Sequence, residues 1–207
     1  MDKKEYILAE REIATQELAI REYAKKVHEY VNQEYGEEKY PYFYHLDKVG
    51  RLVSKYLPSI IENKDDILPV LFGAYFHDSI EDARLTYNDV KKIANVFMTE
   101  AQAHLATEIV YALTNEKGRN RHERANEKYY EGIRECKYAP LVKACDRLAN
   151  YNYAKEHKTR MAEIYAKEMD EFINHIDITK YVTEWHPSLT SAYYLSEELI
   201  SALKSTT

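Results

Sequence analysis

Residues 67–82 read ILPVLFGAYFHDSIED, and this stretch decides how the chain folds. Almost every residue from Ile67 to Ile80 is apolar, which is the pattern of a helix buried on most sides. His77 and Asp78 stand at the end of this element, so we expect them at the most buried point of the chain. Polar groups placed there need a metal, an ionic partner or hydrogen bonds to offset their lost hydration.

The rest of the chain has the composition of long helices. Only five glycines and five prolines interrupt 207 residues, of which 45% are hydrophobic and 31% are charged. This balance favours helices over many short strands, and the length suits one domain with a single core. We therefore predict an all-α fold, with residues 1–207 forming a single bundle of about eight to ten helices.

Helical spacing and capping signals predict where the individual helices lie. We expect one amphipathic helix or two over residues 4–34, a loop over residues 37–44, and a second helix that starts at His45. Thr86 is a predicted cap, and Thr99 followed by Gln102 resembles a capping box. Later helices are expected at Arg121, at Pro140 with Asp146 on its apolar face, after Asn150 as far as Ile176, and from Ser188 beyond a break at His186-Pro187.

Charge and cysteine content bear on the possible partners. The formal charge is −6 and basic residues are interspersed with acidic ones, so the chain has no general attraction for long nucleic acid. Cys136 and Cys145 are too few for a disulfide framework and lack zinc-site spacing, so both are interpreted as reduced thiols. The N-terminus is charged and no run of about 18 apolar residues occurs, so we expect a cytoplasmic protein with no membrane partner. The oligomeric state does not follow from the sequence.

Imidazole and carboxylate side chains recur at positions that the predicted helices bury. His45, His77, Asp78 and Asp146 offer two nitrogen and two oxygen ligands. A mixed set of this kind suits manganese, iron or zinc and leaves coordination positions for water. Because a bound cation lowers the pKa of water, these four residues predict metal-dependent hydrolysis.

A second set of polar residues follows the predicted ligands at helical spacing. Glu81 and Asp82 come four residues after the histidine–aspartate pair, one turn further on if the helix continues. We expect them to orient the attacking water or take its proton without binding the metal. Asn150 lies one turn beyond Asp146, where its amide can donate to a phosphate or hydroxyl without adding charge. The competing interpretation is that all these groups are solvated charges at helix ends.

Together these residues resemble the HD-domain superfamily, and within it the hydrolase domain of RelA/SpoT alarmone enzymes and their small stand-alone relatives. The likeness covers about residues 20–175. It is carried by Tyr44-His45, by FHDSIED at 76–82, by IVYALTNEK at 109–117 and by VKACDRLAN at 142–150. A histidine–aspartate pair followed by a second acidic pair and DRLxN is more specific than the first pair alone.

The resemblance implies a site and a reaction. One Mn²⁺, or another divalent metal, is held by His45, His77, Asp78 and Asp146. Glu81 and Asp82 then serve the attacking water, and Asn150 lies near the nucleotide. The implied substrate is a small nucleotide, the alarmone (p)ppGpp, which loses its 3′-pyrophosphate to give GDP or GTP. The chain is too short to hold a synthetase half as well.

The segment before His45 departs from the family pattern. The family usually carries an Arg-Lys pair that contacts the guanine nucleotide, whereas residues 36–40 read GEEKY here. Lys39 is the only residue of this segment that can replace the Arg-Lys pair. Tyr40, Tyr42 or Tyr44 are candidates to stack on the nucleotide base instead.

Other cations are expected to meet the phosphate charge of the substrate. Lys117 falls in the loop that lies near the substrate in the family, and Arg121 or Arg124 is expected to contact phosphate. Because the base contacts differ, two alternatives stay open. One is an HD phosphohydrolase acting on another nucleotide or on NADPH, and the other is a non-catalytic nucleotide-binding HD protein.

Overall fold

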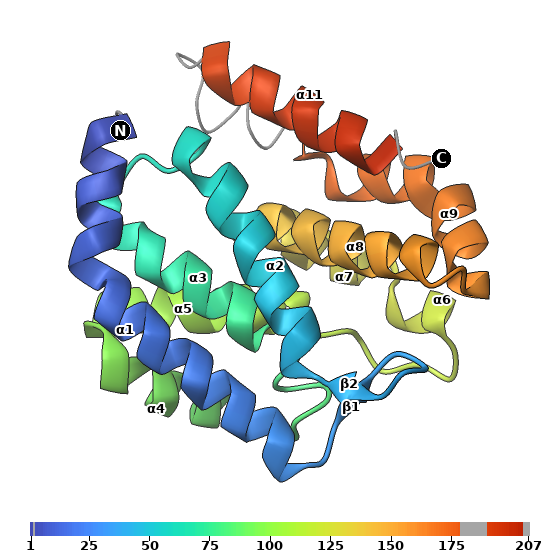
Figure 1. Cartoon of the computed structure of the whole chain (residues 1–207), viewed down its shortest axis with the longest axis horizontal. Coiled ribbons are helices and arrows are strands. Elements are labelled where there is room, and N and C mark those ends of the chain that lie inside the picture. The colour runs from blue at the N-terminus through green and yellow to red at the C-terminus, as the bar shows by residue number, and fades with distance from the viewer. Residues whose placement is uncertain (2, 179–189, 205–207) are drawn as a thin grey trace.

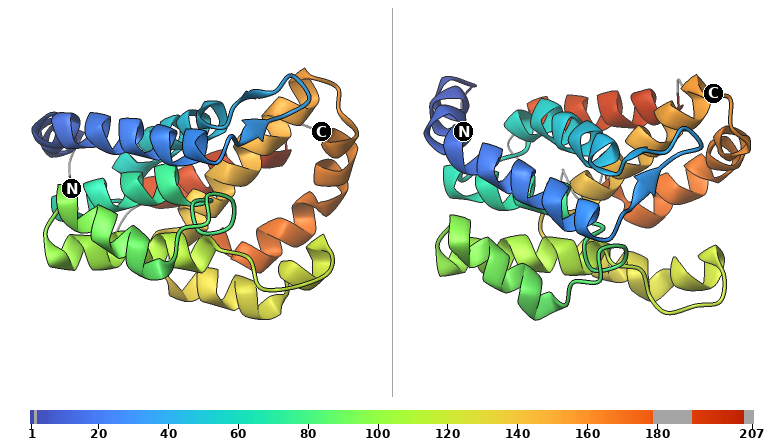
Figure 2. Two further views of the ribbon diagram at one scale, coloured as in Figure 1. Left: turned by 90° about the horizontal axis from the view of Figure 1, so that it is seen from below. Right: turned by 60° about the horizontal axis from the view of Figure 1, so that its bottom comes forward.

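Helix α3 (Ile67–Phe76) lies in the interior of the molecule, and every residue in it is buried (Figure 1). The computed structural model describes residues 1, 3–178 and 190–204. Helices α1 (Lys3–Tyr30) and α2 (Phe43–Tyr56) pack on one side of α3, and α5 (Glu100–Leu113) packs on the other (Figure 2). Within the described residues, helices dominate, so the predicted all-α fold is confirmed.

Close packing sets the position of α3 against α5. A Cβ at Gly73 would lie 2.5 Å from Cγ2 of Ile109, so the absence of a side chain lets the two helices approach. The apolar run predicted a helix as far as Ile80, but α3 ends at Phe76. Residues 77–82 form a series of turns. The amide of Ser79 donates to the carbonyl of Phe76 at 2.9 Å, which closes the first of these turns.

The predicted cap at Thr86 and the predicted capping box at Thr99 are both present, and each is a full capping box. Thr86 caps α4 (Tyr87–Phe97), with its hydroxyl accepting from the amide of Asp89 and the Asp89 carboxylate accepting from the amide of Thr86. Thr99 and Gln102 make the same reciprocal pair at the start of α5. Each box satisfies backbone N–H groups that have no partner inside the helix. Short 3₁₀ helices at Leu57–Ser59 and Lys64–Asp66 connect α2 to α3.

The segment between α1 and α2 is a small hairpin where a loop was predicted. Strands β1 (Glu34–Tyr35) and β2 (Tyr40–Pro41) pair antiparallel, with Tyr35 opposite Tyr40. Gly36 turns the chain with a φ of +75°, a conformation that glycine adopts without strain. The N-terminal helix stops at Tyr30, and α2 begins two residues before His45. The strands are two residues each and the turn between them is held by Tyr153 of the distant segment 139–156, so local sequence did not predict them.

The second half of the chain forms five further helices within the described residues, and one of them packs against α2. They are α6 (Arg121–Arg124), α7 (Glu127–Glu135), α8 (Ala139–Glu156), α9 (Arg160–Ile176) and α11 (Thr190–Lys204). Helix α8 packs against α2 and carries Asp146 as predicted. One helix was predicted after Asn150. It is interrupted at Lys158, where φ is +53°, so this stretch divides into the end of α8 and α9.

Two predictions for the end of the chain concern residues outside the described ranges. They are the break at His186-Pro187 and the start of the last helix at Ser188. None of the helices described combines the length and apolar character that a membrane crossing requires.

Candidate metal centre

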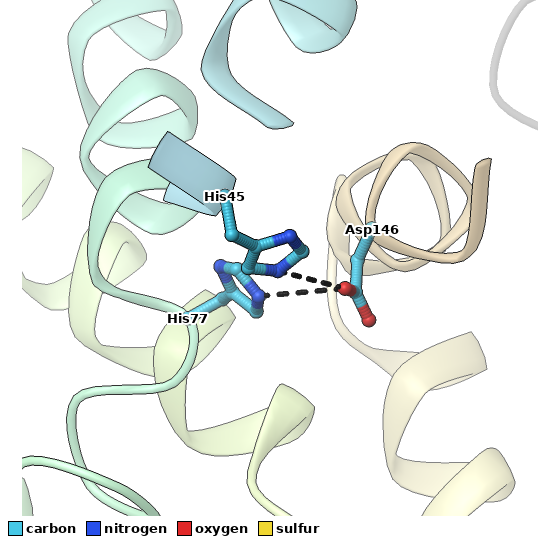
Figure 3. Close-up of side chains that lie close together, drawn as sticks. All are labelled: His45, His77 and Asp146. Atoms are coloured by element: carbon cyan, nitrogen blue, oxygen red, sulfur yellow. Dashed lines mark ion pairs between the residues drawn. The ribbon is translucent and has the colours of Figure 1, made fainter. Parts of the chain in front are cut away.

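Three buried polar side chains from different parts of the bundle meet at one point (Figure 3). His45 comes from α2, His77 directly follows α3, and Asp146 comes from α8. Nε2 of His45 lies 3.2 Å from Oδ1 of Asp146, and Nε2 of His77 lies 3.6 Å from the same oxygen. All three residues are at least nine-tenths buried, so water solvates these polar groups poorly.

Asp78 is the fourth member of this group. Its Oδ2 lies 2.9 Å from Nε2 of His77 and 3.7 Å from Nε2 of His45. The hydroxyl of Tyr42 donates to the same oxygen at 2.5 Å. Adjacent residues on a helix point about 100° apart. His77 caps the end of α3 with helical backbone angles (φ −54°, ψ −33°), yet Oδ2 of Asp78 still reaches Nε2 of both imidazoles. The structure therefore brings His45, His77 and Asp146 into one close group, and Asp78 lies against the two imidazoles of that group.

The tautomer of His77 is the one that a metal ligand requires. Its Nδ1 lies 2.9 Å from the carbonyl oxygen of Ala74. A carbonyl only accepts, so Nδ1 carries a hydrogen and Nε2 is the nitrogen left to bind a metal in place of its proton. Among the described residues, Nε2 has no hydrogen-bond partner although it is fully buried. An unsatisfied nitrogen aimed at two carboxylates fits a divalent cation, and these residues therefore suit a metal.

The charges of the centre are strongly coupled. Burial lowers the pKa of His77, but the neighbouring carboxylates of Asp78 and Asp146 outweigh it and raise the pKa to about 10. Burial raises the pKa of Asp146, yet Lys143 and the two imidazoles outweigh it and hold this pKa well below its usual range. The pKa of Asp78 is lowered in the same way, with the charge of His77 outweighing burial. The carboxylates therefore stay ionised and favour positive charge between them.

Lys143 is a member of the centre that the sequence analysis missed. Its Nζ lies 2.9 Å from Oδ2 of Asp146, on the side of the carboxylate away from the imidazoles. Burial lowers the pKa of Lys143, but the charge of Asp146 outweighs it and raises this pKa well above its usual value. The signal was available, because the two residues are three apart on one helix and such pairs meet on its surface.

Glu81 and Asp82 lie outside the buried group, nearer the surface. Nδ2 of Asn115 donates to both oxygens of Glu81, at 3.0 and 2.8 Å, and a guanidinium nitrogen of Arg124 lies 3.5 Å from Oε1. Nε2 of Gln33 donates to Oδ2 of Asp82 at 2.7 Å. Desolvation and then the charge of nearby Asp78 raise the pKa of Asp82. The two carboxylates therefore have separate partners, Asn115 and Arg124 for Glu81 and Gln33 for Asp82.

Asn150 contacts the centre directly. Its Nδ2 donates to Oδ1 of Asp146 at 2.6 Å, and its Oδ1 accepts from the hydroxyl of Tyr35 at 2.9 Å. The sequence analysis expected this amide to donate to the substrate. In the structure a donor hydrogen is instead engaged by a candidate metal ligand.

The predicted phosphate contacts are dispersed. Arg124 lines a pocket of about 140 Å³ that also includes Lys143, Asp146 and Asn150. Lys117 lines a separate groove between α5 and α7. Lys39 is exposed on the hairpin turn, 3.8 Å from Oε2 of Glu34. The side chain of Arg121 is outside the described part of the structure. Of the three described cations, Arg124 alone lines the pocket that includes Asp146.

The tyrosines before His45 are engaged with protein groups. The rings of Tyr40 and Tyr44 stack on one another at 4.6 Å. Tyr42 stacks on His28 at 4.9 Å and donates to Asp78. Each of these rings therefore already packs against another ring of the protein.

The fold and the site together define an all-α bundle with a buried His-His-Asp group at the junction of α2, α3 and α8. The structure is similar to that of a metazoan ortholog of SpoT that hydrolyzes ppGpp and plays a role in starvation responses. The TM-score is 0.54 and the identity is 19%, over 89% of this chain and 93% of that one. No protein-family model and no curated protein matches the sequence. The chain therefore has the fold of a RelA/SpoT-type hydrolase domain.

Proposed function

We propose that this protein is a metal-dependent hydrolase that removes the 3′-pyrophosphate of (p)ppGpp, giving GDP or GTP and pyrophosphate. The observation that carries the proposal is the buried group of His45, His77 and Asp146, whose nitrogen and oxygen atoms lie close enough to share one ion. The likeness in fold to a protein that hydrolyzes ppGpp supports the choice of substrate.

The four clustered residues are the proposed holders of one Mn²⁺. Two imidazole nitrogens and two carboxylate oxygens, with nitrogen–oxygen distances of 2.9 to 3.7 Å, are a ligand set that first-row divalent metals accept. A cation bound there supplies Lewis-acid activation of water near neutral pH. Lys143 keeps the outer oxygen of Asp146 occupied, so the inner oxygen faces His45 and His77.

Glu81 and Asp82 are the proposed groups that handle water and its proton. The raised pKa of Asp82 makes this carboxylate a better proton acceptor than an isolated aspartate, which suits a general base. Glu81 is held by Asn115 and Arg124, so its position relative to the centre is fixed by the loop after α5 and by α6. We assign Glu81 to orienting the attacking water and Asp82 to taking its proton.

The pocket next to Asp146 is the proposed site for the departing pyrophosphate. Arg124 and Lys143 line it, and cations are the groups that recognise phosphate oxygens. Asn150 contributes an uncharged amide at the same wall. A phosphate entering this pocket competes with Glu81 for Arg124, which links substrate binding to the release of that carboxylate.

A second candidate reaction is favoured by the hairpin. Lys39 is exposed and pairs with Glu34 of β1, so no cation of residues 36–40 is directed at the centre by a described contact. The guanine contacts expected of an alarmone hydrolase then have to come from elsewhere. The alternative is an HD phosphohydrolase that acts on another nucleotide or on the phosphate of NADPH.

The test is a substrate panel with purified protein and Mn²⁺. The panel contains ppGpp, pppGpp, NADPH and common nucleotides, and products are separated by chromatography. We expect GDP or GTP with one equivalent of pyrophosphate from the alarmones, at rates well above those of the other compounds. Comparable rates on many phosphate esters would exclude a dedicated alarmone hydrolase. Tight binding of ppGpp without turnover would instead support a non-catalytic binding protein.

A further inference from the structure

The segment that departs from the family pattern directs hydrogen-bond donors at the site. We call residues 33–42 the hairpin segment. Gln33 donates to Asp82 at 2.7 Å, Tyr35 donates to Asn150 at 2.9 Å, and Tyr42 donates to Asp78 at 2.5 Å. The hairpin segment therefore contacts Asp82, Asn150 and the candidate ligand Asp78.

The contact made by Tyr35 sets the orientation of a side-chain amide. The carboxylate of Asp146 only accepts, so Asn150 must turn its Nδ2 toward that oxygen. Its Oδ1 then faces Tyr35 and needs a donor, which the phenol hydroxyl supplies. Because the hydrogen bonds run in one direction, Tyr35 fixes Asn150 and Asn150 fixes Oδ1 of Asp146. This is the oxygen that faces both imidazoles.

The ring of Tyr35 also contacts the centre directly. It stacks on His45 with ring centroids 4.9 Å apart and planes 17° from parallel. A metal-binding histidine ordinarily donates its second ring nitrogen to a fixed acceptor, which sets the plane of the ring. Nδ1 of His45 is buried and has no such partner among the protein groups described. The stacked ring of Tyr35 supplies the orientation that this hydrogen bond would otherwise give.

We propose that Tyr35 is a positioning residue of the metal centre, acting on Asp146 through Asn150 and on His45 by stacking. This inference rests on the proposed function, because it assumes that these residues hold a divalent cation. It assigns a purpose to the hairpin segment in this chain: the segment orients the protein's own ligands. Although the hairpin segment lacks the Arg-Lys pair of the family, it therefore still supports the proposed metal ligands.

The hairpin has independent attachments to α8, which provide a matched control. The hydroxyl of Tyr153 donates to Glu38, and Nδ1 of His157 lies 2.7 Å from Oε1 of the same glutamate. Tyr153 therefore ties the same hairpin to the same helix with the same chemical group. Its hydroxyl reaches Glu38, which is on the turn and not in the centre.

The experiment compares Mn²⁺ affinity, measured by titration calorimetry, in the wild type, Tyr35→Phe and Tyr153→Phe. Tyr35→Phe keeps the ring on His45 and removes only the donor to Asn150. We expect the dissociation constant for Mn²⁺ to rise about tenfold, since losing such an outer contact typically costs ten- to a hundredfold in affinity. Tyr153→Phe should stay within about twofold of the wild type.

A second variant tests the same connection from its other end. Asn150→Ala removes the amide without altering the hairpin, and it should weaken Mn²⁺ binding at least as much as Tyr35→Phe. In the double variant the loss should equal that of Asn150→Ala alone, because the hydroxyl then has nothing to position. Equal affinity in the wild type and Tyr35→Phe, or an unchanged affinity in Asn150→Ala, would overturn the inference. Failure of the wild type itself to bind Mn²⁺ would instead contradict the proposed function.

Discussion

His77 combines two properties at the scale of a single side chain. Its Nδ1 is fixed by the carbonyl of Ala74, and its Nε2 faces two carboxylates while remaining without a hydrogen bond among the described residues. The first property fixes the ring orientation, and the second leaves Nε2 facing the carboxylates, where a metal can take the place of its proton. Burying an unsatisfied polar group is costly, so the arrangement is best explained by a bound cation.

Changes to the ligands and to the outer carboxylate should separate metal binding from turnover. His77→Ala and Asp78→Ala each remove a proposed ligand, so both should lose bound Mn²⁺ and activity together. Glu81→Gln keeps its contact with Asn115 through the remaining carbonyl oxygen and should retain the metal, while turnover falls by about 10²–10⁴-fold. Metal content by atomic absorption, beside initial rates, measures both effects. Loss of metal in Glu81→Gln would refute this division of roles.

His28 should make stability depend on pH. Burial lowers its pKa below the usual value of 6.5, so below that pH the unfolded chain binds the proton more readily than the folded one. The free energy of unfolding should therefore fall as pH drops from 7.5 to 5.5. The variant His28→Phe, which preserves a ring against Tyr42, should show a smaller fall. Urea unfolding at both pH values measures the free energy of unfolding. An equal fall between the two pH values in the wild type and the variant would contradict the role assigned to His28.

At the scale of the elements, the hairpin depends on one glycine. Gly36 has a φ of +75°, and a Cβ there would overlap the hydroxyl of Tyr153 on α8. Gly36→Ala should therefore lift the hairpin from α8 and reduce stability by roughly 1–3 kcal/mol. Because Tyr35 moves with the hairpin, Mn²⁺ affinity should fall in the same variant. Chemical denaturation and metal titration measure the two effects.

Gly132 in α7 is the matched control for this substitution. It lies inside a helix, and a Cβ there would meet no atom within 4 Å. Gly132→Ala should therefore stabilise the protein by about 0.5–1 kcal/mol, since alanine is the better helix former. Destabilisation by Gly132→Ala, or no effect of Gly36→Ala, would contradict this explanation. It would show that the room for a Cβ and the backbone φ do not decide the effect of replacing these glycines.

For the molecule as a whole, the centre links helices that are distant in the sequence. His45, His77 and Asp146 belong to α2, the end of α3 and α8, so an ion bound by all three stabilises the assembled bundle. Mn²⁺ at about 100 times its dissociation constant should raise the free energy of unfolding by roughly 2.7 kcal/mol. Thermal unfolding with Mn²⁺ and with chelator measures this, and His77→Ala should show no shift. A wild-type midpoint that is insensitive to the metal would argue against the site.

Local signals account for the elements that were predicted correctly. The apolar run that begins at Ile67, and the capping pairs at Thr86 and Thr99, act through residues within one or two turns of each other. The four candidate ligands were also identifiable, because their residue types and helical positions are visible in the sequence. The hairpin was not, since its strands are two residues each and gain stability from Tyr153 on α8 and from His157 directly after it.

The sequence by itself determined that the chain is helical, where most helices begin, and which residues are candidates for a metal. Only the tertiary structure decided that α3 stops at Phe76, that Lys143 pairs with Asp146, and that Tyr35 faces Asn150 and His45. The physical reason is the range of the forces involved. Helix propensity and capping act between near neighbours in the chain, whereas the separation of ligands depends on how distant helices pack.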